Sequence, residues 1–309
     1  MTRNEYELIE HSDLADVKLF LVDLAYRNLH MHNDFELCLL LHGELEVNVQ
    51  CTTYLFSTND LILFNPKQPH ELRTQANSRS LILSLQFSPR FCARYYPKVR
   101  NIEFSGINIS RQSSTAAADA IRHQLLDLAR LYFQDGDHYE LQVYAKMNSL
   151  LHSLVTKFTW RLLSEGEKAQ KATLSDRLNR ILDDIEQHYT DKILLSDIAT
   201  RESLSMTYLS HLFKDQLGLT FQEYVSQRRF DEARSLVERT DMNLTDISLA
   251  SGFSDSRYLN KVFQRQLGCT PAEYRNRITR QRPEMAVQSG HAVQRILSRA
   301  ESLQQVASN

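Results

Sequence analysis

A two-copy repeat near the C-terminus constrains the fold of this 309-residue chain more than any other feature. The segment from Ser196 to Gly218 matches the segment from Thr245 to Gly268, at a period of about 50 residues. The closest stretches are Y-L-S-H-L-F, starting at Tyr208, and Y-L-N-K-V-F, starting at Tyr258. Self-similarity at this period indicates two copies of one supersecondary unit.

Each copy has the pattern of a helix, a tight turn and a second helix. In the first copy Ser205 is placed to cap the second helix, and in the second copy Ser254 or Asp255 is placed to do so. Gly252 can supply the left-handed backbone that such a turn needs, whereas the first copy has Ser203 there. We therefore predict two helix-turn-helix units.

A single helix is predicted to join the two units. It should run from about Phe221 to Glu238, because T-x-x-E capping boxes begin at Thr220 and at Thr270. Its apolar residues can pack on both units and hold them at a fixed separation. If both units enter one face of B-DNA, that separation should be one helical turn, roughly 34 Å.

The second helices have one apolar and one polar face. Apolar residues recur at i, i+3 and i+4 and should face the core. The outer faces carry Thr207, Ser210, His211 and Lys214 in the first copy, and Arg257, Asn260, Lys261 and Gln264 in the second. Arg and Lys can donate to guanine and Asn can pair with adenine. A single copy could be an ordinary helical hairpin, but two matched copies favour DNA binding.

The net charge of the whole chain does not indicate DNA binding, but the charge of the second unit does. The net charge of the chain is −2, yet residues 251–282 contain seven basic and two acidic side chains. Such an excess suits a phosphate-contacting surface, although it would also suit a solvated helix face.

Residues 195–274 resemble the AraC/XylS family of bacterial regulators, most specifically in G-F-S-D-S-R-Y-L-N-K-V-F and L-G-C-T-P-A-E-Y. The resemblance implies seven helices, two of which read double-stranded DNA. It also implies a small-molecule effector, most often a sugar or related metabolite, and activation through contact with RNA polymerase. By position it assigns DNA contact to Thr207, Ser210, His211, Ser256, Arg257, Asn260 and Lys261.

The N-terminal half is predicted to be a small β-barrel followed by helices. Short apolar or alternating runs between Val17 and Phe87 are separated by turn-forming residues. Two amphipathic helices follow, joined near residues 134–137, and they could cover the barrel, form a homodimer seam, or do both. The predicted organisation is an α+β multidomain chain: effector domain 1–110, helical segment 111–165, linker 166–174, DNA-binding domain 175–282 and tail 283–309.

Three histidines and one glutamate mark a candidate effector site in the barrel. His30, His32 and Glu36 have the same parity, so they would point to one face of a strand. With the segment that ends at His70, they resemble the two cupin motifs, and in metal-binding cupins the matching residues are ligands. Lys67 departs from the pattern, because the second motif usually has glycine there.

Three interpretations of this quartet remain open. The preferred one is a polar pocket that binds an organic effector without metal, so no metal, cofactor or catalytic residue is assigned. The second is a metal-dependent cupin enzyme or a metal sensor attached to the DNA-binding domain. The third is that neighbouring groups satisfy the histidines structurally.

The remaining features are those of a cytoplasmic protein without membrane contact. The four cysteines have neither zinc-ligand nor disulfide-framework spacing. The N-terminus lacks the apolar core of a signal peptide, and no apolar run reaches about 18 residues.

Overall fold

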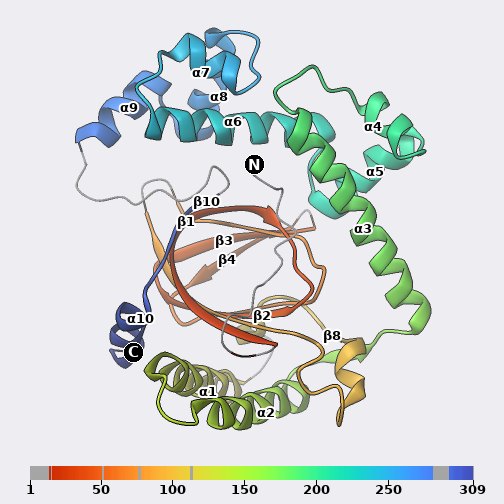
Figure 1. Ribbon diagram of the computed structural model, residues 1–309, viewed down its shortest axis with the longest axis vertical. Helices are drawn as coiled ribbons and strands as arrows, with labels where there is room; N and C mark the ends of the chain where they lie inside the picture. The colour runs from red at the N-terminus through yellow and green to blue at the C-terminus, as the bar shows by residue number, and fades with distance from the viewer. Residues whose placement is uncertain are drawn as a thin grey trace.

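An antiparallel sheet curled into a barrel forms the N-terminal half of the computed structural model, which describes residues 14, 16–50, 52–75, 78–111, 114–280 and 292–308 (Figure 1). Its strand order is β4-β3-β6-β1-β7-β2-β5, with β10 paired to β1. The first seven strands are β1 (Val17–His30), β2 (Phe35–His42), β3 (Glu44–Val49), β4 (Thr52–Ser57), β5 (Leu61–Phe64), β6 (His70–Arg73) and β7 (Ser80–Phe87).

The central strands are apolar on both faces, because two different cores lie on either side of the sheet. In β2, Leu37 and Leu39 belong to the core that faces the helices, whereas Cys38 and Leu40 belong to the core inside the barrel. Successive side chains of a strand point to opposite faces, so a continuous apolar run serves both cores. The predicted barrel with flanking helices is confirmed.

Helices α1 (Thr115–Gln134) and α2 (Tyr139–Lys157) cover one face of the sheet. Asp135 adopts a left-handed conformation at the end of α1 and allows the chain to reverse. Short elements connect this layer to the barrel: η1 (Pro97–Asn101), β8 (Ile102–Phe104), η2 (Ile109–Arg111) and β9 (Trp160–Leu162), which pairs with β8. Both helices therefore cover the core of their own chain, as one of the two interpretations anticipated.

The segment predicted as a linker, 166–174, is helical. It forms the first turns of α3 (Glu165–His188), whose N-terminus has a complete capping box between Ser164 and Glu167. The reciprocal hydrogen bonds satisfy backbone donors that a polar sequence would otherwise leave to water. A continuous helix, and not a flexible tether, therefore connects the barrel to the helical domain.

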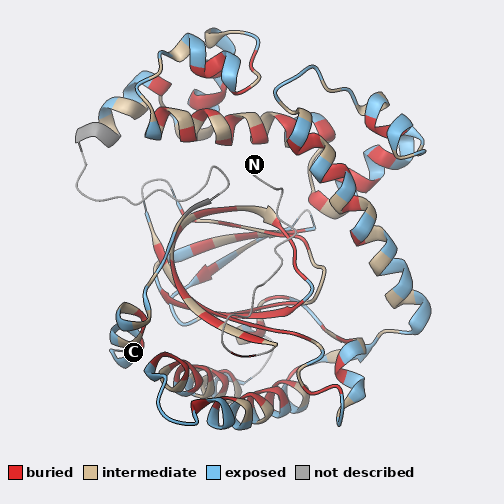
Figure 2. Cartoon of the chain, viewed as in Figure 1, coloured by how far each residue is buried: buried red, intermediate tan, exposed pale blue. Residues whose placement is uncertain are grey.

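The C-terminal domain is entirely helical, and a long helix spans it. One pair of short helices lies at each end of α6, and each pair packs its buried side against α6 in a separate core (Figure 2). The elements are α4 (Leu195–Arg201), α5 (Met206–Leu217), α6 (Phe221–Arg239), α7 (Leu244–Ala250), α8 (Ser256–Leu267) and α9 (Pro271–Arg280). None of the helices in the described part of the chain is both long and apolar enough to cross a bilayer.

The C-terminal segment returns to the barrel. Strand β10 (Ala292–Ile296) pairs antiparallel with β1 between Val22 and Arg27. Helix α10 (Arg299–Ala307) then packs on α1, where Val306 is fully buried in the core beneath the helices. The chain thereby closes into a ring in which the helical domain is attached to the barrel at both of its ends (Figure 1).

We expect Val306→Asp to lower the free energy of unfolding of the barrel half by about 3 kcal/mol or more, because it buries an unpaired carboxylate in an apolar core. Ala307→Asp, on the exposed side of the same turn, should change it by less than about 0.5 kcal/mol. The single tryptophan, Trp160, packs on this core and reports its unfolding in urea by fluorescence. Equal effects of the two substitutions would contradict the docking of α10.

Candidate nucleic-acid interface and effector site

The first helix-turn-helix unit presents a polar face on a firmly held helix. Ser205 caps α5 by accepting a hydrogen bond from the Tyr208 N–H at 3.1 Å. Leu209 and Phe213 are fully buried beneath the helix. The predicted contact residues of this unit are exposed on the opposite side: Thr207, Ser210, His211 and Lys214.

The second unit repeats this arrangement with a stronger cap. Asp255, and not Ser254, caps α8, because its carboxylate accepts from the backbone N–H groups of Arg257 and Tyr258. Leu259 and Phe263 are fully buried. Of the predicted contact residues, Arg257, Asn260 and Lys261 are exposed and Ser256 is half-buried. The side chain of Arg257 is 91% exposed, so it is available to a ligand.

The two turns have the same left-handed geometry, although their sequences differ. Gly252 has a φ of +81° and Ser203 a φ of +54°. A Cβ atom on Gly252 would lie 2.6 Å from Cα of Thr190, which excludes any side chain there. The first copy therefore adopts the turn at a cost in backbone strain, whereas the second requires glycine.

Helix α6 is a single continuous helix that joins the two units. Val225 and Tyr224 pack in the core of the first unit, and Ala233 and Val237 in that of the second. At 1.5 Å per residue its 19 residues span about 28 Å. The predicted connecting helix is confirmed.

A buried ion pair fixes α6 to α3. Arg228 donates two hydrogen bonds to the carboxylate of Glu186, at 2.6 and 2.7 Å. The guanidinium also lies 4.4 Å from the centre of the Tyr189 ring. Such bidentate geometry sets the orientation of α6 relative to α3, and through it the position of the first unit.

In the barrel, the structure brings all four predicted effector residues together. His30, His32, Glu36 and His70 are buried, and one potential ligand atom of each lies within 4.8 Å of the others. The strand argument that predicted this grouping was wrong in detail. His30 ends β1, His32 lies in the following connection, Glu36 is on β2 and His70 begins β6.

Backbone carbonyls orient the three imidazoles. Nδ1 of His30, His32 and His70 lies 2.7, 2.9 and 2.9 Å from the carbonyl oxygens of Asn28, Asp34 and Gln68. A carbonyl oxygen only accepts, so each Nδ1 carries the proton and donates it. The Nε2 atoms are left for the interior, where those of His32 and His70 lie 2.7 and 3.4 Å from Oε2 of Glu36.

The charges of the cluster follow from burial and these contacts. Burial alone would raise the pKa of Glu36, but the hydrogen bond from His32 and the nearby ring of His70 outweigh it and hold the pKa well below its usual range. Burial lowers the pKa values of His30 and His70. Near neutral pH His30 and His70 are therefore neutral and keep Nε2 as an acceptor, whereas Nε2 of His32 carries the proton that it shares with the Glu36 carboxylate at 2.7 Å. A cation or a ligand rich in hydrogen-bond donors would complement these acceptors.

Lys67 contributes to this site through its backbone. It has a φ of +62°, the left-handed conformation for which the cupin-like motif usually has glycine. Its N–H donates to the carbonyl of His32 at 2.7 Å. Lys67 therefore replaces the usual glycine without changing the turn, and this turn positions His32.

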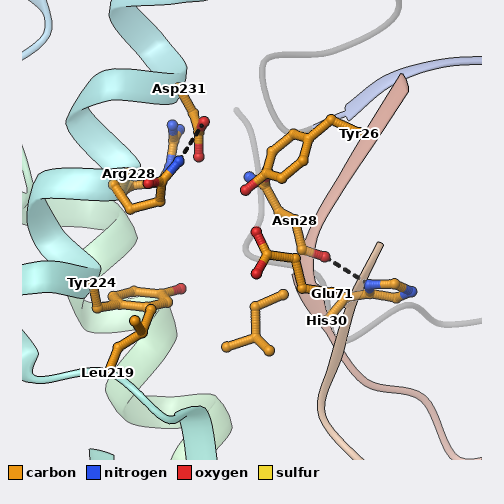
Figure 3. A pocket seen from close by; sticks show the side chains of 10 residues that line it. Tyr26, Asn28, His30, Glu71, Leu219, Tyr224, Arg228 and Asp231 are labelled. Atoms are coloured by element: carbon orange, nitrogen blue, oxygen red, sulfur yellow. Dashed lines mark hydrogen bonds between the residues drawn. The ribbon is translucent and has the colours of Figure 1, made fainter. Parts of the chain in front are cut away.

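A narrow cleft separates this part of the barrel from α6. Tyr26, Asn28, His30 and Glu71 face Tyr224, Arg228 and Asp231 across it (Figure 3). Its volume of about 40 Å³ leaves room for a few water molecules. Asp231 is buried at this boundary, and burial raises its pKa to about 6.

Two family models match the chain in the regions just described. The model for the AraC-like ligand binding domain matches residues 23–155. The model for the helix-turn-helix domain matches residues 198–277. The chain belongs to the AraC family of transcription regulators.

Relatives of this AraC-family protein are transcription regulators. The HTH-type transcriptional activator RhaS of Klebsiella pneumoniae is 36% identical over 115 residues, which is 37% of this chain and 41% of that protein. The probable transcriptional regulator LumQ of Photobacterium leiognathi is 25% identical over 250 residues, 80% and 92% of the two chains. The chain matches 41–62% of the length of three RhaS proteins from different bacteria.

Among solved structures, ToxT from Vibrio cholerae O395 covers 85% of this chain and 98% of its own. The sequence identity is 13% and the TM-score 0.42. The DNA-binding domain of AdpA, solved in complex with a target DNA, is 24% identical and covers 35% of this chain at a TM-score of 0.34.

Sequence reasoning missed the residues that join the two domains. Met31 is buried in the core of the first helix-turn-helix unit, far along the chain from its neighbours there. Tyr26 lies against Arg234 of α6, with the guanidinium 5.0 Å from the ring centre. In the sequence, Met31 stands between His30 and His32. In an extended chain its side chain would therefore point away from theirs, and this was the only indication of its role.

Exchanging the two turn residues tests the backbone argument. We expect Ser203→Gly to increase the local stability of the first unit by about 0.5–1 kcal/mol, because glycine removes the strain of the left-handed conformation. Gly252→Ser should destabilise the second unit by more than about 2 kcal/mol, because its Cβ would collide with Thr190. Amide hydrogen exchange of α4–α5 and α7–α8 in the full chain measures the two changes in local stability. A destabilised first unit or a stabilised second unit would refute the backbone argument.

Proposed function

We propose that this AraC-family chain is a sequence-specific regulator that binds double-stranded DNA through α5 and α8. The observation that carries the proposal is the pair of exposed polar faces, each on a helix with a fully buried underside, at opposite ends of α6. A helix of about 28 Å between the units is suited to placing them in successive major grooves.

The second unit should carry more of the base discrimination. Arg257 and Lys261 can donate to guanine, and Asn260 can pair bidentately with adenine. The first unit offers Thr207, Ser210 and His211, which are weaker readers of base edges. Lys214 and Ser256 lie beside these faces and are proposed as further contacts.

We propose that the barrel binds a small hydroxyl-rich effector, such as a sugar, at His30, His32, Glu36 and His70. The acceptors of this buried cluster would pair with the hydroxyl donors of such a ligand. The regulators named above favour a regulatory and not a catalytic role for the barrel. The cytoplasm is its proposed location.

An activator that contacts RNA polymerase and acts as a homodimer is the most specific form of this proposal. The relative RhaS of Klebsiella pneumoniae is a transcriptional activator, and this supports activation. The outer side of α2 could form the dimer contact, because Leu141 is 74% exposed there. Sedimentation of the full chain as a monomer at all concentrations and on DNA would argue against the dimer.

A substitution on α8 tests direct base recognition. We expect Asn260→Ala to relax base preference at one operator position by about 1–3 kcal/mol, while affinity for other positions is retained. Selection of binding sites from a randomised DNA library, followed by titration, measures this. Asn276→Ala, at an exposed position of α9, is the matched control and should leave base preference unchanged. A uniform loss of affinity for all sequences would contradict base readout by Asn260.

A metal-responsive barrel is a second candidate function, and the orientation of the histidines favours it. Each Nδ1 donates to a backbone carbonyl, which is the usual arrangement behind imidazoles that bind a metal through Nε2. Three Nε2 atoms and a carboxylate form a donor set that suits Zn²⁺, Fe²⁺ or Mn²⁺. Ligand atoms within 4.8 Å of each other are close to the spacing such a shell requires.

If this second function is correct, the full chain will bind one equivalent of Mn²⁺, Fe²⁺ or Zn²⁺, and His32→Ala will reduce the affinity at least about 10-fold. His123→Ala, which removes an exposed histidine of α1, is the matched control. Calorimetric titration and metal analysis after dialysis give the stoichiometry. Binding that His32→Ala does not weaken would place the metal elsewhere.

A further inference from the structure

The residue directly after β1 connects the barrel site to the first helix-turn-helix unit. Met31 is 3% exposed and belongs to the same apolar cluster as residues of α3, α4 and α5. Its sulfur accepts a hydrogen bond from the hydroxyl of Ser175 on α3, at 3.5 Å. Leu29 packs against the same cluster from the end of β1. A barrel side chain is thus part of the core that supports α5.

The neighbours of Met31 in the chain belong to the proposed effector site. His30 and His32 contribute their rings, whose centres are 6.2 Å apart, to the cluster around Glu36. Both rings are also tied to the local backbone, through the carbonyls of Asn28 and Asp34. Alternate residues over three positions therefore serve two different cores.

This alternation makes the two cores mechanically dependent. Because the hydrogen bonds to the carbonyls of Asn28 and Asp34 hold both rings to the backbone, a displacement of His30 and His32 is expected to move the backbone of residue 31 between them. Cores are packed to near crystal density, so a displaced buried side chain requires its neighbours to shift. The second unit is linked differently: its apolar cluster, among the described residues, is drawn entirely from positions 230–274. No described side chain of the barrel enters that cluster, and Tyr26 reaches it only through the guanidinium of Arg234, which lies between the Tyr26 and Phe230 rings.

We propose that Met31 is a positioning residue through which the state of the His30/His32/Glu36/His70 site controls the first helix-turn-helix unit and not the second. The proposal rests on the barrel site proposed above, and it names how that site acts on DNA binding. Occupation of the site would shift α5 relative to α8, changing the match to two successive major grooves.

Hydrogen exchange on the full chain tests this without DNA or effector. Glu36→Gln serves as the input, because it keeps the shape of the side chain and removes the charge that His32 and His70 contact. We expect it to accelerate amide exchange in α4–α5 about fivefold or more, and in α7–α8 less than about twofold. The effect on α4–α5 should fall below about twofold in the background of Met31→Ala.

Two controls separate coupling from loss of packing. Met147→Ala truncates a methionine buried in the core beneath α1 and α2, and should leave the response to Glu36→Gln intact. Met31→Leu conserves volume and should also preserve the response. If Met31→Ala unfolds the first unit, Met31→Val provides the truncated background.

The proposal is overturned if Glu36→Gln leaves α4–α5 unchanged while Met31 is present. It is equally overturned if the response persists at full size without the Met31 side chain. Failure of DNA binding in the library experiment would refute the proposed function and leave this measurement unaffected, so the two failures are distinguishable.

Discussion

One strand, β1, is shared by three parts of the molecule, and the remaining architecture depends on it. Along its length it pairs with β7, then with β6, and β10 bridges the point where the partner changes. Its last residues face α6 across the cleft, and His30 contributes to the buried cluster. A shift of this strand would displace groups in the buried cluster, the DNA-binding domain and the C-terminal segment at the same time.

The domain boundary combines a small apolar contact, made by Leu29 and Met31, with several polar ones. Met31 is enclosed by the core of the first unit, whereas Asp231 is buried 4.0 Å from Arg234. Burying charges costs desolvation energy that the ion pair offsets only in part, as the raised pKa of Asp231 indicates. A boundary of this kind is less costly to open than an apolar one of equal area.

The sequence predicted those features whose signals are local or repeated. The turn at Gly252, the capping boxes at Thr220 and Thr270, and the exposed faces of α5 and α8 all follow from spacing within about 25 residues. The grouping of the histidines was also predicted. The prediction assumed that His30, His32 and Glu36 lie on one strand, whereas in the structure they do not. Motif spacing preserved the grouping, because cupin-like connections return His70 to His30 through β6.

Long-range placement was not predictable from these patterns. Strand β10 has only five residues and finds its partner about 270 residues earlier in the chain, so nothing in its sequence identifies β1. Residues 166–174 looked like a linker because they are polar, but the Ser164–Glu167 capping box and the following apolar positions make them helix.

The closed ring of the chain has a further physical consequence. The helical domain is joined to the barrel by α3 at one end and by the C-terminal segment at the other. Double attachment raises the effective concentration of each domain near the other, so a small number of direct contacts can hold the boundary. The boundary can then rely on polar groups and on Leu29 and Met31, where two untethered domains would need a larger apolar surface. A ligand in the barrel would consequently have to shift only this limited set of contacts to alter the spacing of the reader helices.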